Sequence, residues 1–274
     1  MLTKFHKYDI MDVEILTSED QAMKYGLQLY SVRDAAEIDY KDTLRRVAEM
    51  GYQMVEPAGF FGHSANEVAA WLKEYGLTAC STHTSFKLLK EDLDGQIAYH
   101  KAIGCKDIII PGAPRSTKEE VADLVDTINR IQPIIEDAGM RLHFHNHWQE
   151  FHPNKDGQLV QEILAENTRV LFEIDTFWVF NAGLRAVDVL EQYKDRIRMI
   201  HLKDGIPQDF SDPESKPYGK SVGSGAAPVK EVRKKALDMG LGIVIESEGL
   251  EPTGLEEVKR CIDFLKALDA KDGN

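Results

Sequence analysis

The sequence predicts an α/β fold in which eight parallel strands close into a single-domain (β/α)8 TIM barrel. Short apolar runs alternate with longer amphipathic segments along the whole chain. Strictly alternating strands and helices form a parallel sheet, because each helix returns the chain to the same edge of the sheet. The chain has 274 residues, which is an ordinary length for one such barrel. A doubly wound open sheet is the main alternative that the same alternation allows.

The predicted strands are short apolar runs that start again every ~25–45 residues, the length of one strand, one helix and two loops. A regular interval of this kind favours repeated strand–helix units over separate domains. The runs occupy residues 26–32, 53–59, 77–83, 107–112, 141–147, 170–176, 197–204 and 242–248.

The segments between these strands have the pattern of amphipathic helices. Their apolar residues recur at i, i+3, i+4 and i+7, which places them on one face of a helix. Several of the segments end at glycine, which is typical of helix ends. The clearest examples are residues 40–51, 65–76, 118–139 and 254–268.

The domain organisation is simple. Residues 25–270 are expected to form the barrel, and residues 1–24 an N-terminal extension before the first strand. The longest irregular stretch covers residues 206–228, and its length indicates a functional loop over the site. Its glycine-rich part, residues 219–225, lacks the spacing of a phosphate-binding loop, so we expect flexibility and contact with a substrate oxygen.

Composition narrows the class of protein. A formal net charge of −13 argues against a nucleic-acid partner, since phosphates require a basic surface. No apolar run approaches the roughly 18 residues that cross a membrane. The N-terminal region has no signal-peptide core, so we expect a cytoplasmic protein. The three cysteines are widely spaced and indicate reduced core residues. The expected partner is a small-molecule sugar, and the sequence also allows a homo-oligomer.

Acidic and imidazole side chains gather at the carboxyl ends of the predicted strands. In a barrel these ends meet at one mouth, where active sites are built. Carboxylates and imidazoles suit Mn²⁺, Co²⁺, Fe²⁺ or Zn²⁺, and the absence of cysteine from the set argues against a structural zinc site. The strand-end residues are Glu56, His83, His143, His145, His147, Glu150, Asp175, His201, Lys203 and Glu246.

Several of these residues also have a simpler interpretation. Asp175 could cap the helix that follows it. Glu246 needs a partner if it is buried, and Glu248 competes for the same role. Trp178 could stack on a sugar ring or simply plug the top of the barrel. His143, His145 and His147 alternate and therefore face one side of their strand, which packing alone does not explain.

The motifs at these positions resemble the sugar phosphate isomerase/epimerase branch of the xylose-isomerase-like barrel superfamily. The resemblance runs from Gly26 to about Leu268. Its most specific pieces are GLQLYSVRD, GYQMVEPAGFFG, FHNHWQEF, EIDTFWVFNAG, HLKD and VGSG.

The resemblance implies one divalent metal, for which we expect Mn²⁺ with Co²⁺, Fe²⁺, Zn²⁺ or Mg²⁺ as alternatives. Asp175, His201 and Glu246 match three of the four ligand positions of this superfamily. Many relatives carry glutamate at the fourth position, on the fifth strand, where this chain has His145. We therefore expect Glu150 to be the fourth ligand, with His145 as its competitor.

The expected reaction is proton abstraction next to a carbonyl of a sugar or keto-sugar, through a metal-stabilised enediolate, giving isomerisation or epimerisation. Glu246 is the expected acid/base on one side, and Glu150 or His147 on the other. The residues expected to bind substrate are Glu56, His83, His145, Lys203 and Trp178.

Three other functions compete with this one. A dehydratase or lyase acting on a keto-sugar or 3-keto-glycoside would use the same metal site, with strand-end imidazoles protonating the leaving group. A zinc phosphodiesterase or endonuclease would need more ligands and a basic groove, which the acidic composition disfavours. A non-catalytic sugar-binding protein would lack one of the metal ligands. The only ligand position in question is the one on the fifth predicted strand.

Overall fold

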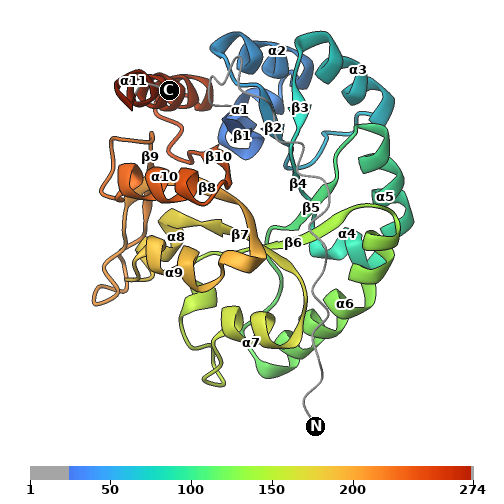
Figure 1. The fold of residues 1–274 in the computed structure, drawn as a ribbon, viewed down its shortest axis with the longest axis vertical. Coiled ribbons are helices and arrows are strands. Elements are labelled where there is room, and N and C mark those ends of the chain that lie inside the picture. The colour runs from blue at the N-terminus through green and yellow to red at the C-terminus, as the bar shows by residue number, and fades with distance from the viewer. Residues whose placement is uncertain (1–24, 273–274) are drawn as a thin grey trace.

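The computed structural model describes residues 25–272 and has the predicted barrel architecture, with a central ring of strands surrounded by helices (Figure 1). The predicted extension, residues 1–24, lies outside the described residues. All eight predicted strands are confirmed, although several are shorter than their apolar runs. The barrel strands are β1 (Gly26–Gln28), β2 (Met54–Glu56), β3 (Thr78–Ala79), β4 (Thr82–His83), β5 (Asp107–Ile110), β6 (Arg141–His145), β7 (Leu171–Asp175), β8 (Ile197–Ile206) and β10 (Gly242–Glu246).

The sheet closes through a single interrupted strand. The third predicted run is divided at Cys80 and Ser81 into β3 and β4. The strand order is β3-β2-β1-β10-β8-β7-β6-β5-β4, so both ends of the path belong to this one run. β3 pairs with β2 and β4 pairs with β5, and every pair around the ring is parallel. The open-sheet alternative is therefore wrong.

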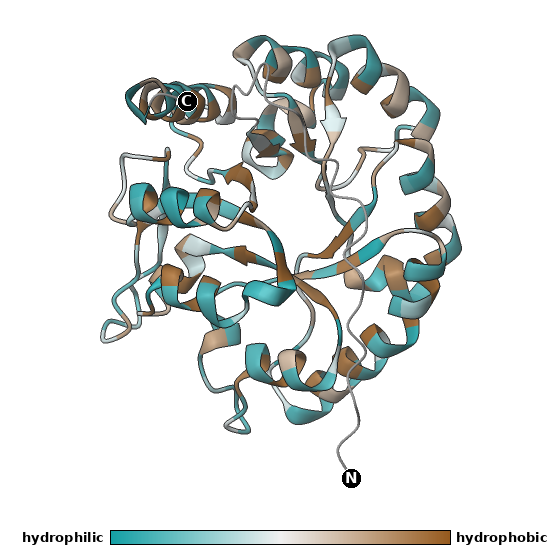
Figure 2. Ribbon diagram, in the orientation of Figure 1, coloured by the Kyte–Doolittle hydropathy of each residue, from teal (hydrophilic) through white to brown (hydrophobic). Residues whose placement is uncertain are grey.

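The helices form an outer layer, and each buries its apolar stripe against the strands (Figure 2). Ser64 and Thr117 each form a reciprocal capping box with a glutamate three residues later, which fixes two helix starts. The helical segments are η1 (Leu29–Val32), α1 (Arg33–Ala36), α2 (Tyr40–Met50), α3 (Ala65–Tyr75), α4 (Phe86–Glu91), α5 (Leu93–Ala102), α6 (Lys118–Asp137), η2 (Gln149–Phe151), α7 (Val160–Asn167), α8 (Thr176–Asn181), α9 (Ala186–Gln192), η3 (Lys194–Arg196), α10 (Val229–Asp238) and α11 (Gly254–Asp272). Within residues 25–272, no helix has the length and hydrophobicity that crossing a bilayer would require.

The long segment after the seventh predicted strand is more ordered than expected. Part of it forms β9 (Tyr218–Lys220), which pairs antiparallel with the end of β8. The buried carboxylate of Asp204 accepts hydrogen bonds from the backbone N–H groups of Gly223 and Gly225, each 2.9 Å long, and of Ala227, 3.0 Å long. A Cβ atom at Gly225 would lie 2.2 Å from an Asp204 oxygen, so glycine is needed there for close approach. The glycine-rich sequence therefore folds around an aspartate.

The amino-terminal end of the barrel holds a buried ion-pair network that separates His143 from the other histidines of its strand. Arg141 lies 2.6 Å from Asp107, and His143 Nε2 lies 2.7 Å from the same carboxylate. Burial alone would raise the pKa of Asp107, but Arg141 and His143 together lower it well below its ordinary value. His143 is thus a structural residue, as its position at the start of the strand allows.

This network predicts a stability change with a definite pH dependence. Asp107→Asn leaves Arg141 and His143 without their anionic partner, so we expect the free energy of unfolding at pH 7 to fall by about 3 kcal/mol. The folded-state pKa of Asp107 lies below its unfolded value of about 3.9. Its stabilisation is therefore present above about pH 4 and is lost as the pH falls through the folded value.

Urea unfolding of both proteins between pH 7 and pH 3 measures this difference, which should shrink toward acid. Asp123→Asn is the matched control, because Asp123 pairs with Lys90 at an exposed position and should change stability little. Equal stabilities at pH 7, or a gap that widens in acid, would contradict the assignment.

Candidate functional site

The inward-facing polar side chains at the carboxyl ends of the strands meet in one buried cluster. The parallel register sets neighbours side by side: His145 lies opposite Glu173, Asp175 opposite His201, and Glu246 opposite Lys203. Alternation along each strand then sends both members of a pair to the barrel interior. Residues from six separate parts of the sequence thus come together, as the prediction from the strand ends requires.

His201 lies at the centre of this cluster and has carboxylates on both sides. Its Nε2 atom is 2.8 Å from Glu56 and 3.2 Å from Glu173, and its Nδ1 atom is 3.2 Å from Glu246. Burial alone would lower the pKa of His201, but Glu173 and Glu56 raise it well above the ordinary value. The protonated ring donates from both nitrogens, from Nε2 toward Glu56 and Glu173 and from Nδ1 toward Glu246.

Glu173 joins the imidazoles on the inner side of the cluster. Its Oε2 atom lies 2.9 Å from His83 Nε2 and 3.2 Å from His145 Nδ1. Burial alone would raise the pKa of Glu173, but His201, His145 and His83 lower it well below its ordinary value. The carboxylate of Glu173 is therefore already compensated by its imidazole partners.

Asp175 and Glu246 share the opposite side with Lys203. The Lys203 ammonium is 3.3 Å from Glu246 and 3.8 Å from Asp175, and it also pairs with Glu248. Burial raises the pKa of Asp175 to about 7 despite Lys203, and the Oδ2 atom of Asp175 has no hydrogen-bond partner. One buried carboxylate oxygen thus has its negative charge incompletely compensated.

Two overlapping groups could hold a metal ion. One contains His83, His145, Glu173 and His201, and the other contains His145, Asp175, His201 and Glu246, with ligand atoms within 4.8 Å of one another. The second group fits a dication better. It offers two carboxylates, whereas the first group offers only Glu173, whose Oε2 atom already contacts three imidazoles although its Oε1 atom, like Oδ2 of Asp175, has no hydrogen-bond partner.

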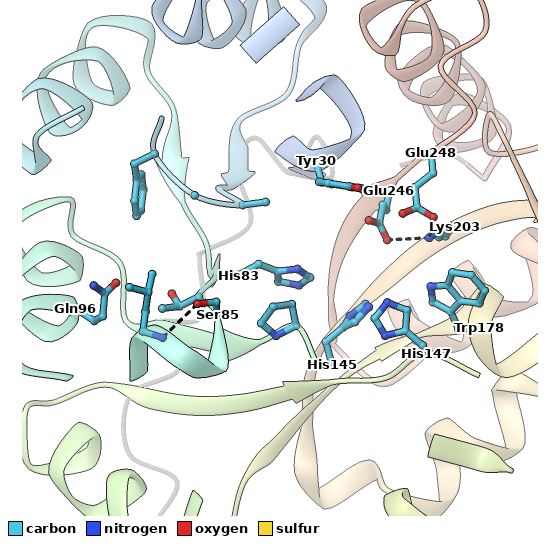
Figure 3. A pocket seen from close by; sticks show the side chains of 16 residues that line it. Tyr30, His83, Ser85, Gln96, His145, His147, Trp178, Lys203, Glu246 and Glu248 are labelled. Atoms are coloured by element: carbon cyan, nitrogen blue, oxygen red, sulfur yellow. Dashed lines mark hydrogen bonds and ion pairs between the residues drawn. The ribbon is translucent and has the colours of Figure 1, made fainter. Parts of the chain in front are cut away.

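A cavity of about 460 Å³ opens onto this cluster (Figure 3). Six of the residues chosen from the sequence line it, together with several that sequence reasoning did not select. No described residue of the segment 206–228 is among the lining residues of this cavity, so the expected contact of that loop with substrate stays a prediction. The lining residues chosen from the sequence are His83, His145, His147, Trp178, Lys203 and Glu246 with its competitor Glu248.

Glu150 is not brought to the cluster. It lies in η2, beyond the end of β6, where its carboxylate is 2.6 Å from Arg115 Nε and accepts a 2.8 Å hydrogen bond from the backbone N–H of His147. Glu150 belongs to neither of the two groups that could hold a metal ion, and it does not line the cavity. In both groups, the fifth predicted strand contributes His145 and not the expected Glu150.

Glu56 also differs from its expected role in substrate binding. Its side chain is fully buried, accepts hydrogen bonds from Gln28 and Ser81, and lies against His201 instead of the cavity. Glu173 was missed altogether, although it precedes Asp175 by two residues and so faces the same side of the strand. That alternation is the signal that could have found it.

Trp178 forms one side of the cavity next to Lys203, whose ammonium lies 4.6 Å from the centre of the indole ring. The neighbouring imidazole of His147 is 5.4 Å from the same ring, centre to centre. Burial, with His145 and Arg115 nearby, lowers the pKa of His147 to about 2. His147 is therefore neutral at pH 7 and can accept a hydrogen bond.

Comparison with known proteins agrees with this architecture. A curated relative, the inosose dehydratase of Geobacillus kaustophilus (strain HTA426), is 28% identical over 191 residues, which are 59% of this chain and 60% of that protein. The match thus spans less than two thirds of the relative's length.

Solved structures show the same fold over nearly the whole chain. A sugar phosphate isomerase/epimerase from Parabacteroides distasonis ATCC 8503 superposes with a TM-score of 0.72 at 24% identity, covering 93% of this chain and 97% of that one. The IOLI protein with a bound zinc atom gives a TM-score of 0.69 at 17% identity, covering 91% and 99%. The family model for the xylose isomerase-like TIM barrel matches residues 44–268. The chain therefore belongs to the xylose isomerase-like TIM barrel family.

Proposed function

We propose that this chain is a divalent-metal-dependent enzyme that removes a proton next to the carbonyl of a sugar or keto-sugar and thereby isomerises or epimerises it. One observation carries the proposal: two members of a four-residue metal-type group, His145 and Glu246, also line the cavity. A relative named as a sugar phosphate isomerase/epimerase supports a carbohydrate substrate.

The proposed metal ligands are His145, Asp175, His201 and Glu246. They replace the set with Glu150, because that carboxylate pairs with Arg115 and belongs to neither group of potential ligands. We propose Mn²⁺, while the same nitrogen and oxygen donors would also accept Co²⁺, Fe²⁺, Zn²⁺ or Mg²⁺. A divalent cation held here supplies a Lewis acid that stabilises negative charge on a substrate oxygen.

Glu246 is the proposed proton acceptor. Its carboxylate faces the cavity, and although burial alone would raise its pKa, Lys203 and His201 lower that pKa well below the ordinary value. The group is therefore deprotonated at pH 7. A carboxylate has two oxygens, so one can contact a metal while the other accepts the proton from carbon.

The other polar groups of the cavity would position the sugar and complete the proton transfer. His147 comes from the segment after β6, across the cavity from β10, and its neutral imidazole can accept a hydrogen bond from a substrate hydroxyl. Lys203 can donate to a substrate oxygen. His83 can hydrogen-bond a hydroxyl, and the ring of Trp178 can cover an apolar sugar face.

A dehydratase that acts on a keto-sugar is the second candidate. The observation that favours it is the withdrawal of Glu150, which leaves the cavity without a fifth-strand carboxylate for proton transfer on the second face of the substrate. The named activity of the inosose dehydratase relative points the same way. In this reaction Glu246 would take the proton, and Lys203 would protonate the departing oxygen.

Proton exchange provides the test of the proposed function. We expect the Mn²⁺-loaded protein to incorporate deuterium next to the carbonyl of at least one sugar in a keto-sugar panel in D₂O, measured by NMR. An epimer or isomer as product supports the first candidate, and an unsaturated product supports the dehydratase. A panel with neither exchange nor product would count against both.

Metal titration tests the ligand assignment. We expect His145→Ala and Asp175→Ala each to weaken Mn²⁺ binding by more than about 100-fold, because loss of a direct ligand costs more than the 10–100-fold typical of groups that only orient a ligand. Glu150→Gln should bind Mn²⁺ nearly as the parent protein does. Calorimetry on chelator-treated protein measures the affinities, and circular dichroism checks folding. Loss of binding in Glu150→Gln with retention in His145→Ala would restore the original assignment.

The role of His147 is tested by a matched pair of substitutions. His147→Asn should reduce turnover by about 10²–10⁴-fold, the usual contribution of one positioned acid or base. Its Mn²⁺ affinity should change little. His152→Asn is the control, since that imidazole contacts the Ala182 carbonyl outside the cavity. Full activity in His147→Asn would indicate that imidazole chemistry is not required.

A further inference from the structure

The cavity is long enough to have two chemically different ends. Among the described residues, the lining residues with formal charges are Lys203, Glu246 and Glu248, and they lie together at the end next to the proposed metal ligands. Figure 3 places Ser85 and Gln96 at the opposite end, away from Glu246 and Lys203. Ser85 precedes α4 and Gln96 belongs to α5, so this second end is built by the segment that follows β4.

We propose that this second end is a subsite for an uncharged ring attached to the reacting keto-sugar, so that the substrate is an unphosphorylated glycoside that carries a ketone on the reacting ring. The inference rests on the proposed function, which places the reacting sugar next to Glu246 and Lys203. It adds the identity of the rest of the substrate.

Among the described residues, no free cationic side chain lines this cavity to pair with a phosphate. The one lining lysine, Lys203, is already surrounded by Asp175, Glu246 and Glu248. With a bound dication, the formal charges of these four residues and the metal sum to zero, so no positive charge is left over for an additional anion. A phosphorylated sugar would therefore lose the water around its phosphate without a compensating ion pair.

The arginines nearest this region are also engaged elsewhere. Arg115 pairs with Glu150, and Arg33 stacks 4.2 Å from the centre of the Tyr30 ring while donating to the Tyr30 carbonyl. Neither arginine is among the residues that line the cavity. Recognition of phosphate by a bidentate guanidinium, the usual protein solution, is thus not provided in this part of the described chain.

The second end suits an uncharged ring instead. Phe60 and Leu88 give it apolar surface, and Ser85 and Gln96 give it hydroxyl and amide groups. Leu88 is 44% exposed although it is a large apolar side chain, which is the expected state of a contact that a ligand would cover. A sugar or aryl ring has apolar faces and polar edges, and this combination matches both kinds of group.

Isothermal calorimetry on the full-length Mn²⁺-loaded protein tests the subsite. The probes are methyl and phenyl D-glucopyranoside, as both anomers, with D-glucose and D-glucose 6-phosphate. We expect the better phenyl anomer to bind about tenfold more tightly than its methyl counterpart, as burial of roughly 60 Å² of apolar surface would give. Glucose 6-phosphate should bind no more tightly than glucose.

A matched pair of variants locates the effect. Leu88→Ala should reduce the phenyl preference severalfold and leave the affinity for the methyl glycoside unchanged. Leu184→Ala makes the same change at a residue that is 41% exposed and lines a different pocket, so it should keep the preference.

The subsite is wrong if phenyl and methyl glycosides bind equally, if neither binds, if Leu88→Ala keeps the full preference, or if glucose 6-phosphate binds more tightly than glucose. Failure of the proposed function looks different. In that case the phenyl preference persists while no keto-sugar exchanges deuterium. Deuterium exchange without a phenyl preference would instead reject the subsite alone.

Discussion

Burial of four carboxylates at one end of the barrel is the constraint on which the site depends. Glu56, Glu173, Asp175 and Glu246 all lie out of water within one cluster. Isolated buried carboxylates are very costly, so each must find a positive or hydrogen-bonding partner. Three histidines and one lysine are the main partners of these carboxylates. The arrangement of the barrel mouth follows from which carboxylates each of these partners contacts.

His201 divides these partners into two layers. Glu56 and Glu173 lie on its Nε2 side, and Asp175 and Glu246 lie on its Nδ1 side. The inner layer is largely satisfied by imidazoles, and it fixes the orientation of the ring. The outer layer has an unpartnered Asp175 oxygen and opens to the cavity. An inner layer that orients a ligand and an outer layer that is short of positive charge are both consistent with the proposed metal centre.

The loops above the barrel add selectivity to this centre. The segment after β4 supplies the uncharged end of the cavity, while the segment after β6 supplies His147 and keeps Glu150 occupied with Arg115. The long segment after β8 is tied down by Asp204 and takes no part in lining the cavity. Fold and chemistry are therefore separable here, since different loops on the same strands could serve another substrate.

The sequence by itself determined the barrel and the core of the cluster. Alternating apolar runs and amphipathic segments can bury their apolar surface in few ways, and strand ends of a barrel must converge. Asp175, His201 and Glu246 could be found for that reason. Glu173 followed the same period-two rule and was accessible to it. Within a strand, side-chain direction is a property of the local chain.

Only the tertiary structure decided what happens beyond the strand ends. Glu150 follows β6 by five residues, where a turn and a partner from another loop, Arg115, set its direction. No sequence period describes such a contact. The placement of Leu88 and Gln96 against the same cavity likewise depends on how α4 and α5 pack over the barrel. These contacts join residues distant in sequence, so the energy that selects them exists only in the folded chain.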